Sequence, residues 1–400
     1  MRTTDTKPTL TPKLRFPEFR DRPTWEAKLG DELFDQINNR EAPAGLPILA
    51  ITQEHGAIPR DAIDYHVSVT DKSVETYKEV LPGDFIISLR SFQGGIEYSE
   101  YHGICSPAYV ILRKRTELAD LFYKYLFKSH RFILQLTKNL EGLRDGKMIS
   151  YKQFSELLLP APSPPEQHQI ASCLSSLDDL IGAESRKLDA LKAHKKGLMQ
   201  QLFLCAGETR PRFRFPEFQD APEWQEKTLA DVCGMQAGKF VHAAEIKDQP
   251  ANGRFPCYGG NGLRGYTNTH THEGVYPLVG RQGALCGNVK LCTGKFHATE
   301  HAIVASPKKG IDAVWLYYAL DLLKLNRFAT GQAQPGLSVE VLGNVALAVP
   351  EQETEQHHIA ACLSSLDDLI TAQADKVESL KAHKKGLMQQ LFPSAARALA

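Results

Sequence analysis

The chain has little of what would assign it to a class at once. Its 400 residues hold 47 Lys plus Arg against 47 Asp plus Glu, so the basic excess typical of many nucleic-acid-binding proteins is missing. No apolar stretch approaches the roughly 20 residues that span a bilayer, and the polar first residues lack the apolar segment of a signal peptide. We therefore expect a soluble, cytoplasmic protein in which any charge that binds a nucleic acid is concentrated locally.

Motifs of catalysis and metal binding are also missing. The eight cysteines include no Cys-x-x-Cys pair, which argues against a zinc site. There is no Gly-x-Ser-x-Gly nucleophile elbow, and Gly234–Phe240 contains Gly-Lys without the Ser or Thr of a phosphate-binding loop. The carboxylate pairs Asp178–Asp179 and Asp367–Asp368 repeat identically, which favours helix-surface charge or subunit docking over catalysis. We expect neither a catalytic residue nor a metal site in this chain.

What the chain does have is an internal duplication. The segment Leu14–Phe19 (LRFPEF) recurs as Phe213–Phe218 (FRFPEF), and a Trp follows each copy at the same distance. Two further segments recur unchanged: CLSSLDDLI at residues 173–181 and 362–370, and LKAHKKGLMQQLF at residues 191–203 and 380–392. Between these repeats, from Trp25 to about Pro160 and from Trp224 to Pro350, the two halves share no clear run of identical residues. We call the repeated segments the frames and the two divergent stretches the centres. Repeated frames around different centres suit one partner bound twice and two different ligands.

Each frame contains the heptad pattern of a long helix. Prolines at residues 162–165 and 350 mark where the preceding element stops and a helix begins. From there, steps of four and three alternate over about five heptads, the spacing of a coiled coil. The predicted seam consists of Ile170, Leu174, Leu177, Ile181, Glu184, Leu188, Leu191, Lys195, Leu198 and Leu202 in the first helix, and of Ile359, Leu363, Leu366, Ile370, Gln373, Val377, Leu380, Lys384, Leu387 and Leu391 in the second.

We expect the two helices to pair with each other and to run antiparallel. A parallel, in-register pair would place Lys195 against Lys384 in the seam, which is unfavourable. An antiparallel register avoids this repulsion, because it can place Glu184 against Lys384. The same register would place Gln373 against Lys195. About 38 helical residues span roughly 57 Å, enough to hold two modules over successive turns of DNA, so the pair could act as a ruler.

The second centre carries a local excess of positive charge. Residues 249–299 hold five Lys or Arg and a single acid, Glu273, with aromatic residues interleaved. Two glycine-rich loops, Tyr258–Tyr266 and Val279–Gly283, present Asn, Gln and Arg side chains, which can read base edges through paired hydrogen bonds. The alternative is that the glycines only turn β-hairpins and that the cations are solvated. Our candidate DNA contacts here are Tyr258, Asn261, Arg264, Arg281, Gln282 and Lys295.

The first centre gives weaker signals. Ile86–Gly95 reads as a strand that runs into a loop, with polar side chains exposed near the turn. The cluster Arg113–Arg115 is basic, although such a cluster is more often a solvated strand end. Both centres close on a glycine-flanked loop, Gly142–Lys147 in the first and Gly331–Gly336 in the second. These segments add the candidate DNA contacts Arg90, Ser91, Gln93, Arg113, Arg144 and Lys147 in the first centre, and Gln332 and Gln334 in the second.

In combination, these features resemble the specificity (S) subunits of type I restriction–modification systems. The resemblance covers nearly the whole chain after residue 13, although no single motif would suffice. The segments that carry it are the two openings Leu14–Phe19 and Phe213–Phe218, the helix starts Pro165–Ile170 (PEQHQI) and Glu355–Ile359 (EQHHI), the loops Tyr258–Tyr266 and Val279–Gly283, and Ala298–Thr299.

The resemblance implies an α+β fold. Two pseudo-two-fold-related target-recognition domains would be joined by two long helices that form an antiparallel coiled coil. The domains would occupy residues 14–163 and 204–352, after a flexible tail at residues 1–13. The helical spacers would occupy residues 164–203 and 353–400.

By the same resemblance, the chain would be a non-catalytic reader of double-stranded DNA, with each domain reading one half of an asymmetric, two-part target. Its partners would be two modification (methyltransferase) subunits and the restriction/translocase subunits, and S-adenosylmethionine, ATP and magnesium would bind in those partners. Two alternatives stay open. The chain could be the recognition subunit of another restriction class or of a methylation-only system, or it could be a coiled-coil scaffold that presents two domains to ligands other than DNA.

Overall fold

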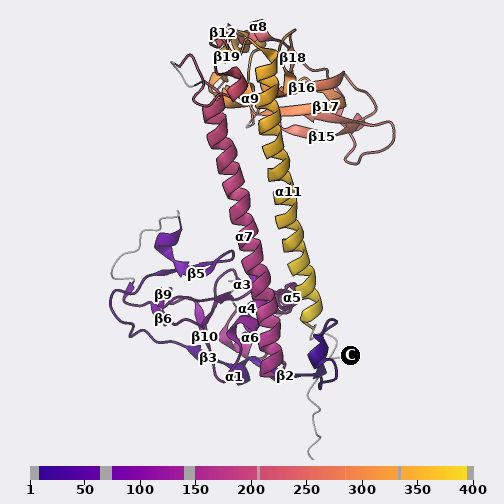
Figure 1. Ribbon diagram of the computed structural model, residues 1–400. Helices are drawn as coiled ribbons and strands as arrows, with labels where there is room; N and C mark the ends of the chain where they lie inside the picture. The colour runs from indigo at the N-terminus through magenta and orange to yellow at the C-terminus, as the bar shows by residue number, and fades with distance from the viewer. Residues whose placement is uncertain are drawn as a thin grey trace, which may run out of the picture. The chain divides into compact units, whose positions relative to one another are not determined.

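The chain folds into two compact units, and each unit takes one part of each long helix (Figure 1). The computed structural model describes residues 9–63, 74–138, 149–204, 208–283, 285–331 and 335–393. Unit 1 consists of Met1–Ser185 and Asp375–Ala400, and unit 2 consists of Arg186–Ala374. The boundary falls within α7 (Pro164–Leu202) and α11 (Glu353–Leu391), so each of these helices begins in one unit and ends in the other. The predicted α+β fold with two repeated units and two long helices is confirmed.

Unit 1 combines small, mostly antiparallel sheets with short helices. The sheet β1-β2-β11 joins the two ends of the first centre, and a four-stranded sheet has the order β3-β10-β7-β8. Leu10 in β1 is 4% exposed, so an ordered strand lies within the segment predicted as a flexible tail. The elements are β1 (Thr9–Leu10), η1 (Pro17–Phe19), β2 (Trp25–Leu29), α1 (Gly30–Leu33), β3 (Phe34–Ile37), β4 (Leu49–Thr52), β5 (Gly56–Pro59), η2 (Arg60–Ala62), β6 (Lys78–Val80), β7 (Phe85–Ile87), α3 (Ser91–Gly94), β8 (Glu97–Tyr98), β9 (Gly103–Cys105), β10 (Val110–Lys114), α4 (Asp120–Lys128), α5 (His130–Lys138), α6 (Tyr151–Ser155) and β11 (Leu158–Ala161).

Unit 2 has one large sheet in place of several small ones. The six-stranded sheet has the order β13-β18-β16-β17-β14-β15, and β12 pairs with β19 as β2 pairs with β11 in unit 1. The elements are η3 (Pro216–Phe218), β12 (Gln225–Thr228), α8 (Leu229–Val232), β13 (Cys233–Ala237), η4 (Ala243–Glu245), β14 (Phe255–Gly259), β15 (Gly262–Thr267), β16 (His272–Gly280), β17 (Val289–Ala298), β18 (Ala302–Pro307), α9 (Ala313–Leu322), η5 (Leu325–Phe328), α10 (Val339–Gly343) and β19 (Ala346–Val349).

The repeated motifs fasten each centre to the start of its own long helix. In unit 1 the guanidinium of Arg15 donates to both carboxylate oxygens of Glu166 at 2.8 Å, and Glu166 is 1% exposed. In unit 2 Arg214 donates to Glu355 at 2.8 and 2.7 Å, and Glu355 is also 1% exposed. A buried carboxylate needs a paired cation, which explains why the Arg and Glu of both frames recur together.

A second repeated contact ties the first turn of each long helix to a helix of the centre. The Gln167 side chain accepts from the backbone N–H of Ala119, directly before α4, and donates to the carbonyl of Pro162. Gln356 does the same in unit 2, where it accepts from the N–H of Asp312 before α9 and donates to the carbonyl of Pro350. α4 and α9 are therefore equivalent helices, although they lie in centres that share no clear run of identical residues.

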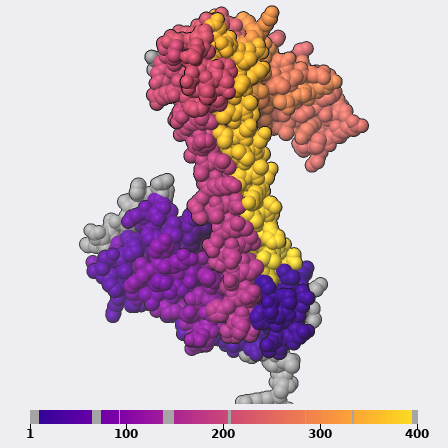
Figure 2. All heavy atoms as spheres, in the orientation of Figure 1, coloured from indigo at the N-terminus to yellow at the C-terminus, as the bar shows by residue number. Residues whose placement is uncertain are grey.

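Within each unit the two helix segments pack side by side and run antiparallel. In unit 1 Lys384 contacts Asp178 and Lys376 contacts Glu184, so residue numbers fall along α11 as they rise along α7. Figure 2 shows the last part of α11, in yellow, against the first part of α7. All predicted seam positions are buried or half-buried, and a buried Phe directly follows each helix, Phe203 in unit 2 and Phe392 in unit 1.

The predicted register of the helices is wrong. Glu184 contacts Lys376 instead of Lys384, and Lys195 contacts Asp367 at 2.5 Å instead of lying against Gln373. The prediction assumed that polar seam residues face one another. A lysine side chain is long enough to leave an apolar seam and place its ammonium at the flank, where Asp178 and Asp367 stand beside the seam leucines.

Candidate nucleic-acid interface

The glycine-rich segment of unit 2 is a tight β-hairpin. β14 ends at Gly259 and β15 begins at Gly262, which leaves Gly260 and Asn261 at the tip. Gly262 has a φ of 93°, a conformation that favours glycine. Asn261 is exposed. The glycines thus do turn a hairpin, as the simpler reading held, and the turn also exposes the Asn side chain that we predict to contact DNA.

A second loop lies directly against this hairpin tip. A Cβ atom on Gly260 would stand 2.9 Å from the carbonyl oxygen of His301 and 3.0 Å from that of Gln282. The backbone N–H of Arg281 donates to the carbonyl of His301 at 2.9 Å, and the Arg281 guanidinium reaches the carbonyl of Glu300 at 3.4 Å. Glycine is therefore required at residue 260 because three chain segments meet there, and this close packing places the hairpin tip that carries Asn261 against the loop of Arg281 and Gln282.

Polar groups of these loops are arranged in a short network. Nδ1 of His301 donates to Oε1 of Gln282 at 2.9 Å, and its Nε2 lies 3.1 Å from the Glu300 carboxylate. The hydroxyl of Thr299 is buried and has no hydrogen-bond partner within the described part of the chain. Oriented side chains and an unpaired buried hydroxyl are features that suit a polar ligand.

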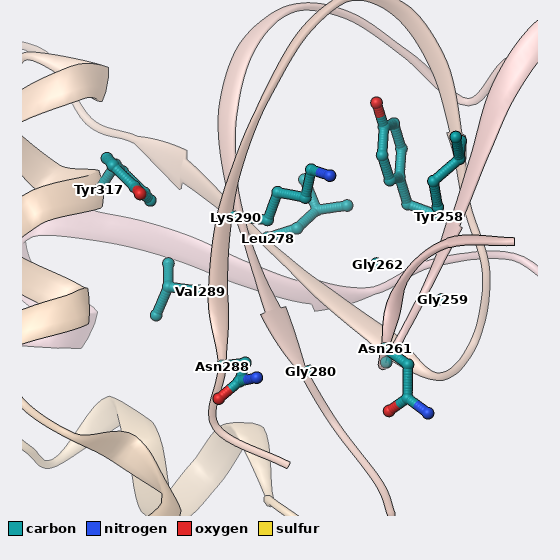
Figure 3. A pocket seen from close by; sticks show the side chains of 12 residues that line it. Tyr258, Gly259, Asn261, Gly262, Leu278, Gly280, Asn288, Val289, Lys290 and Tyr317 are labelled. Carbon is teal, nitrogen blue, oxygen red and sulfur yellow. The ribbon is translucent and has the colours of Figure 1, made fainter. Parts of the chain in front are cut away.

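A pocket of about 240 Å³ opens beside the hairpin (Figure 3). Tyr258, Asn261, Asn288 and Lys290 contribute polar groups to its wall, and Leu278 and Tyr317 contribute apolar surface. The ammonium of Lys290 lies 5.4 Å from the centroid of the Tyr258 ring. Burial raises the pKa of the Tyr258 hydroxyl, which therefore stays protonated and can donate a hydrogen bond. Tyr258 and Asn261, both predicted contacts, thus line one pocket.

Of the other predicted contacts of unit 2, two are exposed and two lie outside the described residues. Arg264 is exposed on β15, three residues after Asn261. Lys295 is exposed on β17 and lies 3.7 Å from Glu273, the one acid of that segment. Gln332 and Gln334 lie outside the described residues. For all of these side chains a contact with DNA stays a prediction.

Unit 1 presents its predicted contacts differently. Arg90 and Gln93 are exposed around the short helix α3. The prediction that Ser91 is exposed is wrong, because Ser91 is 1% exposed and its hydroxyl accepts from the backbone N–H of Ser88 at 2.8 Å. That geometry gives Ser91 a role in the turn and disfavours a direct contact with DNA.

Arg113 is also engaged within the protein. Its guanidinium donates to both carboxylate oxygens of Asp84 at 2.8 and 2.7 Å, and Asp84 is 1% exposed. The hydrogen bonds to Asp84 raise the pKa of Arg113. Contact with DNA would compete with this ion pair. Arg144 and Lys147 lie outside the described residues.

Several side chains of the unit 2 site escaped the sequence prediction. His301, Glu300 and Asn288 belong to no motif, and Lys290 was counted only as part of the basic stretch. They reach the site because β16, β17 and β18 are neighbours in the sheet. The charge excess of residues 249–299 was the one signal that could have pointed to Lys290.

The fold and the site together define a two-module recognition protein. Two α+β units share a pair of helices, and polar and cationic loops are exposed on their divergent centres. Comparison with known proteins makes this class specific. The sequence profile of the type I restriction modification DNA specificity domain matches the chain twice, at residues 32–193 and 222–382. The chain therefore belongs to this family and carries two copies of its domain, so the predicted resemblance is confirmed.

Individual relatives agree with the family. The chain is 32% identical to the type I restriction enzyme EcoprrI specificity subunit of Escherichia coli, over 66% of each chain. It is 26% identical to the MjaVIII specificity subunit of Methanocaldococcus jannaschii, over 96% of this chain and 94% of that one. The S subunit structure from M. genitalium has the same fold, with a TM-score of 0.64 at 19% identity over 96% of this chain and 99% of that one.

Proposed function

We propose that this chain is the sequence-reading subunit of a type I restriction–modification complex. Each unit reads one half of a two-part DNA target, and the two halves differ in sequence. The observation that carries this proposal is the contrast between the identical attachments of the two centres and their different exposed chemistry. In unit 2 the readers are Asn261, Arg281 and Gln282, which lie on two loops whose backbones pack against each other at Gly260.

The shared helices set the gap between the two half-sites and hold the modification subunits. The repeat CLSSLDDLI supports this role, because it leaves equivalent side chains on the surface of each unit. Leu180 is 43% exposed and Leu369 is 55% exposed, and Asp179 and Asp368 beside them are exposed as well. An exposed leucine repeated with its acidic neighbour suits one partner bound twice. One copy of the modification subunit would bind each of these two surfaces.

The chemistry of the complex resides in the partner subunits. Within the described part of the chain, no group of three His, Cys, Asp or Glu residues could hold a metal ion, and no helix is long and apolar enough to cross a membrane. We place S-adenosylmethionine, ATP and magnesium in the modification and restriction subunits, as the family resemblance implies. This chain then supplies DNA recognition and geometry.

The proposal is tested by co-expressing the chain with its modification subunit and sequencing the host DNA for methylated adenine. We expect methylation confined to one two-part motif with a fixed gap. Inserting one heptad into α7 should lengthen the gap and leave both half-sites unchanged, because the insertion preserves the seam. Half-sites that change with the insertion would contradict the proposal that the helix pair sets only the gap.

The scaffold alternative makes different predictions for the same complex. DNA affinity of a sequence reader should fall steeply with salt, because phosphate contacts release counterions. A stable complex with an active modification subunit but no methylated motif would favour a scaffold for ligands other than DNA.

A further inference from the structure

One three-residue contact occurs in unit 1 at the point where α4, α7 and α11 meet. The Tyr125 hydroxyl of α4 donates to one carboxylate oxygen of Asp178 in α7 at 2.8 Å. The Lys384 ammonium of α11 donates to the other oxygen and lies 4.9 Å from the centroid of the Tyr125 ring. We call this tyrosine–aspartate–lysine contact the clamp. It joins three helices through a single carboxylate.

Unit 2 contains the same clamp. The Tyr318 hydroxyl of α9 donates to Asp367 of α11 at 2.7 Å. The Lys195 ammonium of α7 donates to both oxygens of Asp367, at 2.5 and 2.7 Å, and lies 5.0 Å from the centroid of the Tyr318 ring. The helices have exchanged roles, since α11 now supplies the aspartate and α7 the lysine. The contact is therefore a property of the fold in both units.

The tyrosine is the informative member. Asp178 and Lys384 belong to the repeated frames, so their recurrence needs no further cause. Tyr125 and Tyr318 lie in the divergent centres, where the neighbouring helix residues differ, for example Phe122 in α4 and Trp315 in α9. Burial and the hydrogen bond to Asp178 raise the pKa of Tyr125, so its hydroxyl remains a donor. Two centres that share no clear run of identical residues thus have the same side chain at this contact.

The clamp gives each centre a polar attachment to the helices away from the helix start. The first attachment is at the helix start, through Glu166 in unit 1 and Glu355 in unit 2. From Glu166 to Asp178, and from Glu355 to Asp367, the helix rises by about 18 Å. The centre also shares an apolar core with the helices, and polar attachments at two separate levels along the helix add a directional constraint on its orientation. Since the lysine comes from the other helix, the same contact also fixes the helix register.

We propose that the two clamps determine gap selectivity: each holds the orientation of its centre on the helix pair and so restricts the complex to targets with one spacing. The clamp residues are positioning residues, because no step of the argument brings them into contact with DNA. The inference rests on the proposed function, since a gap is defined only if both units read half-sites.

The experiment uses the full chain in complex with its modification subunit. Methylation is measured on a set of targets that keep both half-sites and vary the gap by one or two base pairs. Tyr125→Phe keeps the ring and removes the hydroxyl, and Lys384→Met removes the ammonium. The matched control is Lys376→Met, because Lys376 forms an ion pair with Glu184 on the same pair of helices but is 53% exposed and contacts no tyrosine in the described structure.

We expect the wild-type complex and Lys376→Met to methylate one gap. Tyr125→Phe and Lys384→Met should raise methylation of targets one base pair shorter or longer by roughly tenfold relative to the preferred gap, the scale of one lost hydrogen bond to a charged group. The preferred half-site sequences should not change. Tyr318→Phe in unit 2 should act in the same way.

Retention of a single gap by both variants would overturn the clamp proposal, whether total methylation is normal or uniformly reduced, since uniform loss is the result expected of a stability contact. Tyr125→Phe keeps the proposal testable if Lys384→Met fails to assemble. Failure of the proposed function is distinguishable, because the wild-type complex would then show no two-part motif at all.

Discussion

The two units use their positive charges differently. In unit 1 two cations near the predicted site have internal partners, Arg113 with Asp84 and Lys128 with Glu97 at 2.5 Å, while Arg90 is exposed. In unit 2 Arg264, Arg281 and Lys290 form no ion pair within the described part of the chain. A cation with an internal partner must give up that contact before it can bind DNA, whereas an unpaired cation need not. Internal pairing thus decides how much of each unit's basic charge is available for recognition.

The units also differ at the one contact that the frames repeat most closely. Glu355 accepts from Arg214 and, at 3.2 Å, from the indole N–H of Trp224. Its counterpart Glu166 accepts from Arg15, and the indole nitrogen of Trp25 is buried without a hydrogen-bond partner in the described structure. The same motif therefore has a different hydrogen-bond complement in each unit. The hydrogen bonds from arginine to glutamate are the part of the motif that both units share.

The largest effect is expected from removing the buried carboxylate of a frame. Glu355→Ala leaves the buried guanidinium of Arg214 without its partner, which should lower the free energy of unfolding by about 3–5 kcal/mol. Urea denaturation followed by tryptophan fluorescence measures this loss. Glu273→Ala is the control, since its pair with Lys295 is exposed and should change stability little. Equal free energies of unfolding for the two variants would show that the Arg214–Glu355 pair does not stabilise the attachment of the centre to α11.

The next largest effect should separate the two half-sites. Arg281→Ala and Asn261→Ala should each weaken binding by ~1–3 kcal/mol, and only to targets with the correct second half-site. Titration of the complex against targets that alter one half at a time gives the answer. Arg186→Ala, at an exposed position on α7, serves as the control. Equal weakening on every sequence would show that these residues contact phosphates or support the loops.

A smaller effect tests the corrected role of Ser91. Ser91→Ala removes the acceptor of the Ser88 N–H and should lower the stability of unit 1 by about 1–2 kcal/mol. Gln93→Ala, exposed in the same short helix, should leave stability unchanged. If Ser91→Ala instead changed the first half-site while the unfolding curve stayed the same, the prediction from sequence would be restored.

The smallest effect compares the two frame tryptophans. Trp224→Phe removes a hydrogen bond to Glu355, whereas Trp25→Phe removes none. Since both changes remove similar apolar area, the loss of unfolding free energy should be larger for Trp224→Phe by roughly 1 kcal/mol. Parallel denaturation curves of the two variants measure the difference. Identical losses would mean that the indole N–H contributes nothing to the frame.

The helix pair shows which structural features the heptad periodicity of the sequence can predict. A seam written in steps of four and three predicts which face of each helix is covered, and those positions are buried or half-buried. It does not predict register, because lysine can satisfy its charge beside the seam as well as across it. In the observed register Lys384 and Lys195 pair with Asp178 and Asp367, which also accept from the two clamp tyrosines, and these tyrosines come from elements outside the helix pair.

The sequence by itself determined the duplication and the long helices, because these depend on repeated segments and on local periodicity. Its motifs in combination indicated the family, and the resemblance to that family implied the α+β class. It also located the loops Tyr258–Tyr266 and Val279–Gly283, since glycine and charge are concentrated there. Only the tertiary structure decided which charges are free, that Ser91 is buried, and that His301 and Lys290 join the site. These properties depend on contacts between residues far apart in the chain, and neither composition nor spacing carries that information.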